Sequence, residues 1–103
     1  MDRAPGTFEV TEQPGGEVVV TVAGELDIGN LPELADRVDA ALARGPRRMI
    51  VDVSQVSFAD SAAISLWLQW SMAVPEFELR DPPVLLRAVI TMMRLTEQLG
   101  LTQ

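Results

Sequence analysis

Alternating apolar and polar residues divide the first quarter of the chain into two short strands. Residues 7–13 place Phe8 and Val10 between polar neighbours, and residues 17–23 form the almost wholly apolar run EVVVTVA. Pro14-Gly15-Gly16 separates the two runs with a turn sequence. The pattern predicts a hairpin with a half-buried first strand and an interior second strand that is covered on both faces.

A helix, a strand and a second helix are predicted next. Apolar residues three or four positions apart indicate a helix that begins near Leu31 and ends at Gly45-Pro46. Asn30 and Glu33 have the spacing of a capping box at its start. Residues 49–53 form a short apolar run rich in β-branched residues, which predicts a buried strand. Residues 62–73 contain no Gly, Pro or charge and predict the second helix.

The last quarter of the chain predicts one more strand and one more helix. Residues 76–80 resemble a short strand with Phe77 and Leu79 on one face. A final helical region follows Pro83, with its apolar residues roughly in helical register: Val84, Leu85, Ala88, Val89, Met92 and Met93. We interpret the two methionines as flexible filler of the core.

The order of these elements predicts a single α/β domain. Strands joined by helices are ordinarily parallel, with right-handed crossover connections. We therefore expect a mixed four-stranded sheet, made of the N-terminal hairpin plus parallel crossovers and packed with three to four helices. The 103 residues suffice for one hydrophobic core. We expect a flexible lead at residues 1–6 and the domain at residues 7–103.

Composition argues against most kinds of chemistry. The chain contains neither Cys nor His, and its eight basic residues are all Arg. The usual general base, a cysteine nucleophile and the commonest metal ligands are therefore missing, and we expect a binding protein without a metal site or cofactor instead of an enzyme. A formal net charge of -7 disfavours nucleic-acid binding.

No apolar run of eighteen or more residues occurs, and residues 1–10 lack the apolar centre of a signal peptide. We therefore expect a cytoplasmic protein that makes no direct membrane contact.

The segment between the third strand and the second helix carries the candidate chemistry. Residues 54–60 form an expected polar turn, which Val56 and Phe58 would attach to the core. Asp60 and Ser61 then stand directly before the helix. One interpretation is a simple N-cap, because a Ser or Asp oxygen accepts from unpaired backbone N–H groups. The other is that Ser61 offers an exposed hydroxyl where a helix start would stabilise an added phosphate.

The pattern Asp52-Val53-Ser54-x-Val56-x-Phe58-x-Asp60-Ser61 resembles the phosphorylation-site signature of STAS domains of the anti-sigma factor antagonist family. In that family the Ser after the Asp accepts the phosphoryl group, so the resemblance implies that Ser61 is the phosphoacceptor. Ala62 and Ala63 depart from the family pattern, which has Ser or Thr and then Gly at these positions.

A second feature of the family is similar to Gly24-Glu25-Leu26-Asp27. The resemblance implies that Asp27 lies near the phosphoacceptor loop and contacts the anti-sigma partner. The alternative is a loop carboxylate that orders its own turn or caps the next helix.

The helix after Ser61 is apolar on two sides. At 100° per residue, one side holds Ile64, Trp67, Leu68 and Ser71, and the opposite side holds Ala62, Leu66, Trp70 and Ala73. Ser61, Ser65 and Gln69 form a polar stripe between them. The family pattern places the first side inward, which would leave Leu66 and Trp70 exposed as a contact patch. Alternatively, Trp70 folds back over Pro75 or a neighbouring helix.

The resemblance implies an anti-sigma factor antagonist that sequesters an anti-sigma factor of the serine kinase type. Phosphorylation of Ser61 would weaken that complex, and a phosphatase would reverse it. The expected partner-binding residues are Asp27, Asp60, Ser65, Leu66, Gln69 and Trp70. The alternative is a STAS domain that serves as an assembly subunit without phosphorylation, for example in a lipid-transport ATPase complex.

Overall fold

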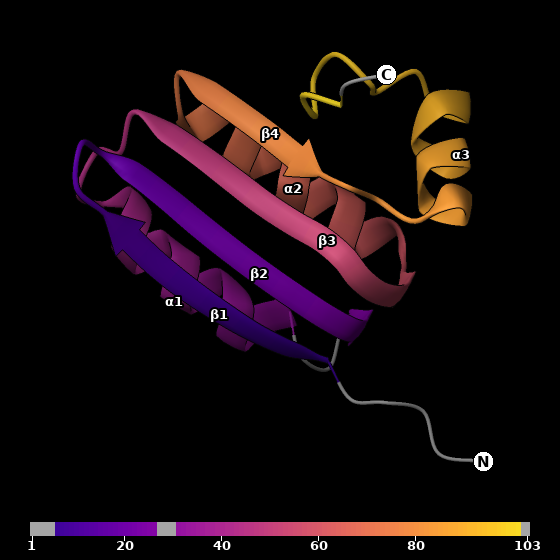
Figure 1. Ribbon diagram of the computed structural model, residues 1–103, viewed down its shortest axis with the longest axis horizontal. Helices are drawn as coiled ribbons and strands as arrows, with labels where there is room; N and C mark the ends of the chain where they lie inside the picture. Colours follow the sequence, from indigo (N-terminus) through magenta and orange to yellow (C-terminus); the bar gives the residue numbers. More distant parts are fainter. Residues whose placement is uncertain (1–5, 27–30, 102–103) are drawn as a thin grey trace.

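The computed structural model describes residues 6–26 and 31–101. Four strands form one sheet in the order β1-β2-β3-β4 (Figure 1). β1 (Thr7–Gln13) pairs antiparallel with β2 (Glu17–Leu26), whereas β3 (Arg48–Ala59) and β4 (Glu76–Arg80) continue the sheet in parallel. The described helices are α1 (Leu31–Leu42), α2 (Ser61–Ala73) and α3 (Val84–Met92). The expected α/β fold with a mixed sheet is therefore confirmed.

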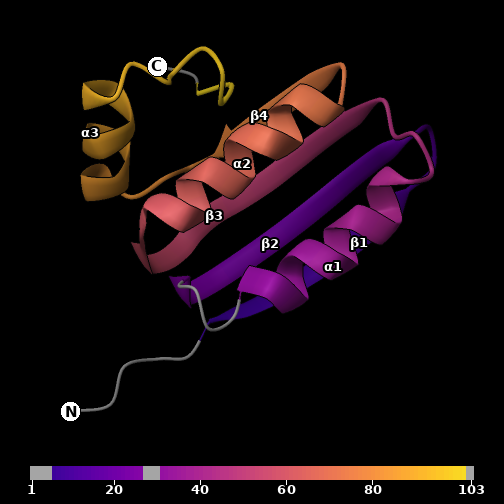
Figure 2. The same ribbon diagram turned by 180° about the vertical axis from the view of Figure 1, so that it is seen from behind.

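The sheet is covered by helices on one face only. α1 and α2 lie side by side across that face, as the reverse view shows (Figure 2). Along β2, Val18, Val20 and Val22 are buried, while Val19 is half-buried and Thr21 is exposed on the other face. The expectation that β2 is covered on both faces is therefore wrong. Its apolar composition does not reveal that one of its two faces is left to solvent.

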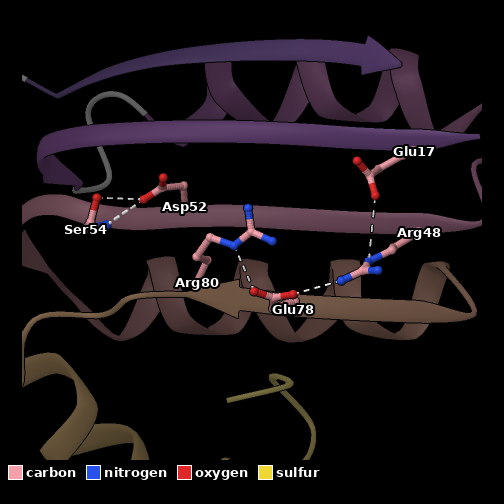
Figure 3. Close-up of polar contacts among 6 residues, drawn as sticks. All are labelled: Glu17, Arg48, Asp52, Ser54, Glu78 and Arg80. Atoms are coloured by element: carbon pink, nitrogen blue, oxygen red, sulfur yellow. Dashed lines mark hydrogen bonds and ion pairs between the residues drawn. The ribbon is translucent and has the colours of Figure 1, made fainter. Parts of the chain in front are cut away.

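The open face of the sheet carries a row of ion pairs across three strands (Figure 3). Arg48 of β3 donates to Glu78 of β4 at 2.9 Å and lies 3.8 Å from Glu17 of β2. Arg80 donates to the second oxygen of Glu78, also at 2.9 Å. Because Arg80 and then Arg48 bond and attract this carboxylate, they hold the pKa of Glu78 below its ordinary value. Ion pairs thus link neighbouring strands on the open face, whereas apolar side chains fill the helix-covered face.

β3 is longer than the pattern predicts. Residues 54–59, expected as a polar turn, continue the strand and pair with the end of β2. Two register shifts, opposite Thr21/Ala23 and Gly24/Glu25 of β2, interrupt this pairing, each with one extra residue in β3. Val56 is buried as expected, but Phe58 is 49% exposed and does not attach this segment to the core. In a regular strand, Val53 and Val56 would point to opposite faces of the sheet because they are three residues apart. The shifted register explains why both are buried.

The C-terminal segment covers the outer edge of β4. The amide of Leu79 in β4 donates to the carbonyl of Leu99 at 2.9 Å, and Leu99 is fully buried. Gly100 follows with a φ of +62° and lies against the backbone of Phe77. Glycine is favoured there by the conformation and required by the close approach, which leaves no room for a Cβ.

α3 faces the opposite way from the sequence expectation. It lies beyond the end of the sheet, next to the end of β3 and far from α1 (Figures 1 and 2). Its buried residues are Leu86 and Ile90, whereas Met92 is 83% exposed and Met93 is about half exposed. The interpretation of the two methionines as core filler is wrong. Since α3 is apolar on nearly all sides, its periodicity could not select the inward side.

Candidate functional site

The candidate site is built around the start of α2. Asp60 is the N-cap residue, with extended backbone angles of -89° and -178°, and its carboxylate accepts a hydrogen bond from the Ala63 amide at 3.1 Å. Ser61 is the first residue of the helix and is exposed. Asp60 therefore performs the capping, and the hydroxyl of Ser61 remains at the surface. The N-cap interpretation is therefore confirmed for Asp60, whereas phosphorylation of Ser61 stays a prediction.

A polar stripe runs along the outer side of α2 from Ser61. Ser65 and Gln69 follow at intervals of four residues and are both exposed. Because four residues of an α-helix complete slightly more than one turn, the three side chains lie on one side of the helix. The structure therefore brings Ser61, Ser65 and Gln69 together on one accessible face.

The contact patch expected at Leu66 and Trp70 is only half present. Leu66 is half-buried, but Trp70 is 2% exposed and belongs to the core. The prediction that Trp70 lies on the surface is wrong. The inward side of α2 consists of Ala63, Ile64, Trp67 and Trp70. Residues three apart are separated by only about 60° around a helix, so Trp67 and Trp70 can pack against the same sheet.

A shallow groove of about 340 Å³ lies between α1 and α2, next to the polar stripe. We call it the α1–α2 groove; its lining residues are Leu31, Pro32, Ala35, Ala62, Ser65, Leu66 and Gln69. Aliphatic and alanine side chains supply most of the lining, while Ser65 and Gln69 supply its polar groups. The sequence did not indicate that α1 contributes to this surface, because only the fold brings the start of α1 beside α2.

The two alanines that depart from the family pattern have different environments. Ala63 is fully buried, so its methyl group packs into the core and occupies no surface beside Ser61. Ala62 is exposed and lines the α1–α2 groove. Only Ala62 therefore changes the surface that a partner would meet.

Asp27 and Asn30 lie outside the described residues. The last described residue before them, Leu26, is buried and pairs with Ala59 of β3. Ala59 directly precedes Asp60 in the chain. The end of β2 is thus beside the candidate site.

Residues 6–26 and 31–101 contain no group of three or more Asp or Glu side chains placed to hold a metal ion. Within the same ranges, no helix has the length and hydrophobicity to cross a membrane.

Comparison with protein families identifies the family of this fold. The family model described as "Mlab, STAS domain" matches residues 10–103, so the chain belongs to the STAS domain family. This confirms the resemblance that the motif before α2 indicated. A search of curated proteins found no match to this chain.

Solved structures of anti-sigma factor antagonists share the fold. The crystal structure of an anti-sigma factor antagonist from Mycobacterium paratuberculosis matches with a TM-score of 0.76 and 26% identity, covering 90% of this chain and 81% of that chain. The anti-sigma factor antagonist SpoIIAA in its unphosphorylated form matches with a TM-score of 0.79 and 22% identity, covering 89% and 84%. The Bacillus cell fate determinant SpoIIAA in the phosphorylated form matches with a TM-score of 0.74 and 22% identity, covering 89% and 87%.

Proposed function

We propose that this protein is an anti-sigma factor antagonist whose binding is switched by phosphorylation of Ser61. The observation that carries the proposal is the exposed Ser61 at the first position of α2, next to a capping Asp60. The similarity to an anti-sigma factor antagonist of 26% identity supports the class of partner. In this role the protein acts by binding, and the phosphoryl transfer is performed by the partner.

The polar stripe and the α1–α2 groove form the proposed partner surface. Ser65 and Gln69 offer hydrogen bonds, and Leu66 offers an apolar contact at the groove. Asp27 is proposed to complete this surface beside Asp60. Trp70 is excluded from direct contact because it is buried, and its part is to hold α2 against the sheet.

Phosphorylation would weaken such a complex by charge and by bulk. The Ser61 oxygen attacks the terminal phosphoryl group of ATP bound to the partner kinase, the hydroxyl proton is lost, and ADP leaves. The product carries close to two negative charges at neutral pH. Asp60 is adjacent, and its carboxylate already accepts from the Ala63 amide. The added charge therefore meets an existing negative group and disfavours an acidic or closely packed partner surface. A phosphatase would restore the binding form.

A second candidate function is that of an assembly subunit that is never phosphorylated. Ala62 favours it, because this exposed methyl group makes the α1–α2 groove more apolar than a Ser or Thr at the same position would. An apolar groove is suited to a permanent contact that no charge needs to release. A component of a lipid-transport ATPase complex is one partner of this kind.

The test is affinity capture from lysate of the source organism with four proteins compared: wild type, Ser61→Ala, Ser61→Asp and Thr11→Asp. Thr11 is exposed on β1 and pairs with Val19 on the open face, so the control adds the same charge away from α2. We expect wild type, Ser61→Ala and Thr11→Asp to capture a kinase-type anti-sigma factor that Ser61→Asp fails to capture. Capture of a transport component by all four proteins would instead establish the assembly subunit.

A further inference from the structure

The outward side of α3 is an apolar surface that the proposed function does not use. We call it the α3 face and define it by Phe58, Val84, Leu85, Val89 and Met92. Val84, Leu85 and Met92 are each more than four-fifths exposed. The nine residues of α3 include one charged side chain, Arg87, and no acidic one. A helix that is apolar nearly all round is ordinarily buried, and exposed patches of this kind mark interaction sites.

The α3 face contains both a groove and a projecting side chain. The groove has a volume of about 380 Å³ and lies between the end of β3 and the start of α3, where Phe58, Val84 and Leu85 line it. Met92 is exposed at the other end of the helix, seven residues or about 10 Å beyond Leu85. Two copies related by a two-fold axis present the same surface to each other, so the Met92 of each could enter the groove of the other.

Charge favours a second copy as the occupant of this surface. The chain has 15 acidic and 8 basic residues, so contacts between copies elsewhere tend to bring like charges together. The five residues of the α3 face carry no charge. Contact through this face therefore avoids the repulsion that the rest of the molecule would impose on self-association.

We propose that two copies of this chain associate through the α3 face, with their α3 helices antiparallel and Met92 of each copy in the groove of the other. The exposed fractions of these five side chains correspond to roughly 500 Å² of apolar area in each copy. Covering this area in both copies would bury about 1,000 Å² in total, which is at the low end for specific complexes. The dimer is therefore weak and reversible, and it does not depend on Ser61.

Sedimentation velocity of the full chain tests the proposal. Between about 1 μM and about 1 mM, a range that covers weak association, the average mass should rise from the monomer value of 11.2 kDa toward twice that value. Leu85→Asp, at a position 82% exposed, should abolish the rise without changing the circular dichroism spectrum. Met72→Asp places the same charge at an 81% exposed position on α2 and should behave as wild type.

A single introduced cysteine tests the antiparallel arrangement of the two α3 helices, since the chain has no cysteine of its own. Ala88 is exposed at the middle of α3, where an antiparallel pair crosses the two-fold axis. Ala88→Cys should form a disulfide-linked dimer on oxidation, whereas Met72→Cys should remain monomeric. A wild-type protein that stays monomeric throughout the range would overturn the proposal, and so would self-association that Leu85→Asp leaves intact.

Discussion

Replacement of Gly100 by Ala should destabilise the fold far more than the same replacement at Gly45. Both glycines have nearly the same backbone conformation, with φ of +62° and +68°. A Cβ on Gly45 would meet nothing within 4 Å, whereas a Cβ on Gly100 would overlap the carbonyl oxygen of Phe77 and lie 3.0 Å from the Cα of Glu78. The pair therefore separates the cost of the conformation from the cost of the close approach.

The magnitude follows from what has to move. At Gly45 the left-handed conformation alone costs an alanine about 1–2 kcal/mol. At Gly100 the C-terminal segment must also lift away from β4, because the overlap involves backbone on both sides. That movement breaks the hydrogen bond from Leu79 to Leu99, worth about 0.5–1.5 kcal/mol, and partly exposes the buried side chain of Leu99, worth about 1.5–3 kcal/mol. We expect Gly100→Ala to cost about 3–6 kcal/mol.

Urea unfolding followed by tryptophan fluorescence measures this difference, since Trp67 and Trp70 are both buried and report on the core. A loss of 3 kcal/mol or more corresponds to a fall of at least about 10 °C in Tm for a domain of this size. If Gly100→Ala and Gly45→Ala lose the same free energy of unfolding, the C-terminal segment does not pack against β4 as described, and the reasoning is refuted.

Two other predictions concern α2 and the open face of the sheet. Trp67→Ala and Trp70→Ala should each lower the free energy of unfolding by about 3–5 kcal/mol in urea titrations followed by circular dichroism, with Met72→Ala as an exposed control; a loss below about 1 kcal/mol for Trp70→Ala would contradict its burial. Arg80 and Arg48 lower the pKa of Glu78 in the folded protein below its ordinary value of 4.5. The two ion pairs therefore stabilise the fold fully above pH 4.5, and this contribution is lost as the pH falls through the lowered pKa of the folded state. Unfolding titrations across the acid range should therefore show that the free energy of unfolding falls less with decreasing pH for Glu78→Gln than for wild type. The difference should be less than about 1 kcal/mol, because these ion pairs lie near the surface. An equal fall in the two proteins would count against the ion pairs.

The candidate site could be predicted largely from local signals. An Asp-Ser pair directly before a helix without Gly, Pro or charge indicates a capped helix start, and Asp60 is found to cap it. The resemblance of the preceding strand and turn to the STAS signature then identified the family that the comparison confirmed. These signals lie within about ten residues of chain, so no knowledge of tertiary packing was needed.

The faces of the helices could not be predicted in the same way. α2 and α3 have apolar residues on more than one side, and the pattern alone allows several orientations about the helix axis. α2 packs against the sheet with the side that holds both Trp67 and Trp70, and α3 buries Leu86 and Ile90. The packing of the whole domain makes that choice.

The extension of β3 was missed for a related reason. The alternation of apolar and polar side chains along β3 is broken at Ser54-Gln55, where two polar residues follow each other and the register against β2 shifts. A strand with an irregular register does not show the period of two that identifies strands in a sequence. The contribution of α1 to the α1–α2 groove could not be predicted either, since Leu31 and Leu66 are distant in the chain and only the fold brings them together.

Coverage of the β4 edge by the C-terminal segment also protects the protein from aggregation. An unpaired edge strand is a template on which strands of other molecules can add, and long flat edges of this kind start fibrils. The hydrogen bond from Leu79 to Leu99 occupies a backbone group of β4 and so hinders strand addition at this edge of the sheet. β1 forms the opposite edge and carries Glu9 and Glu12, whose charges discourage strand addition. A chain shortened before Leu99 would lose this protection, and we expect it to precipitate on heating where the full chain unfolds reversibly.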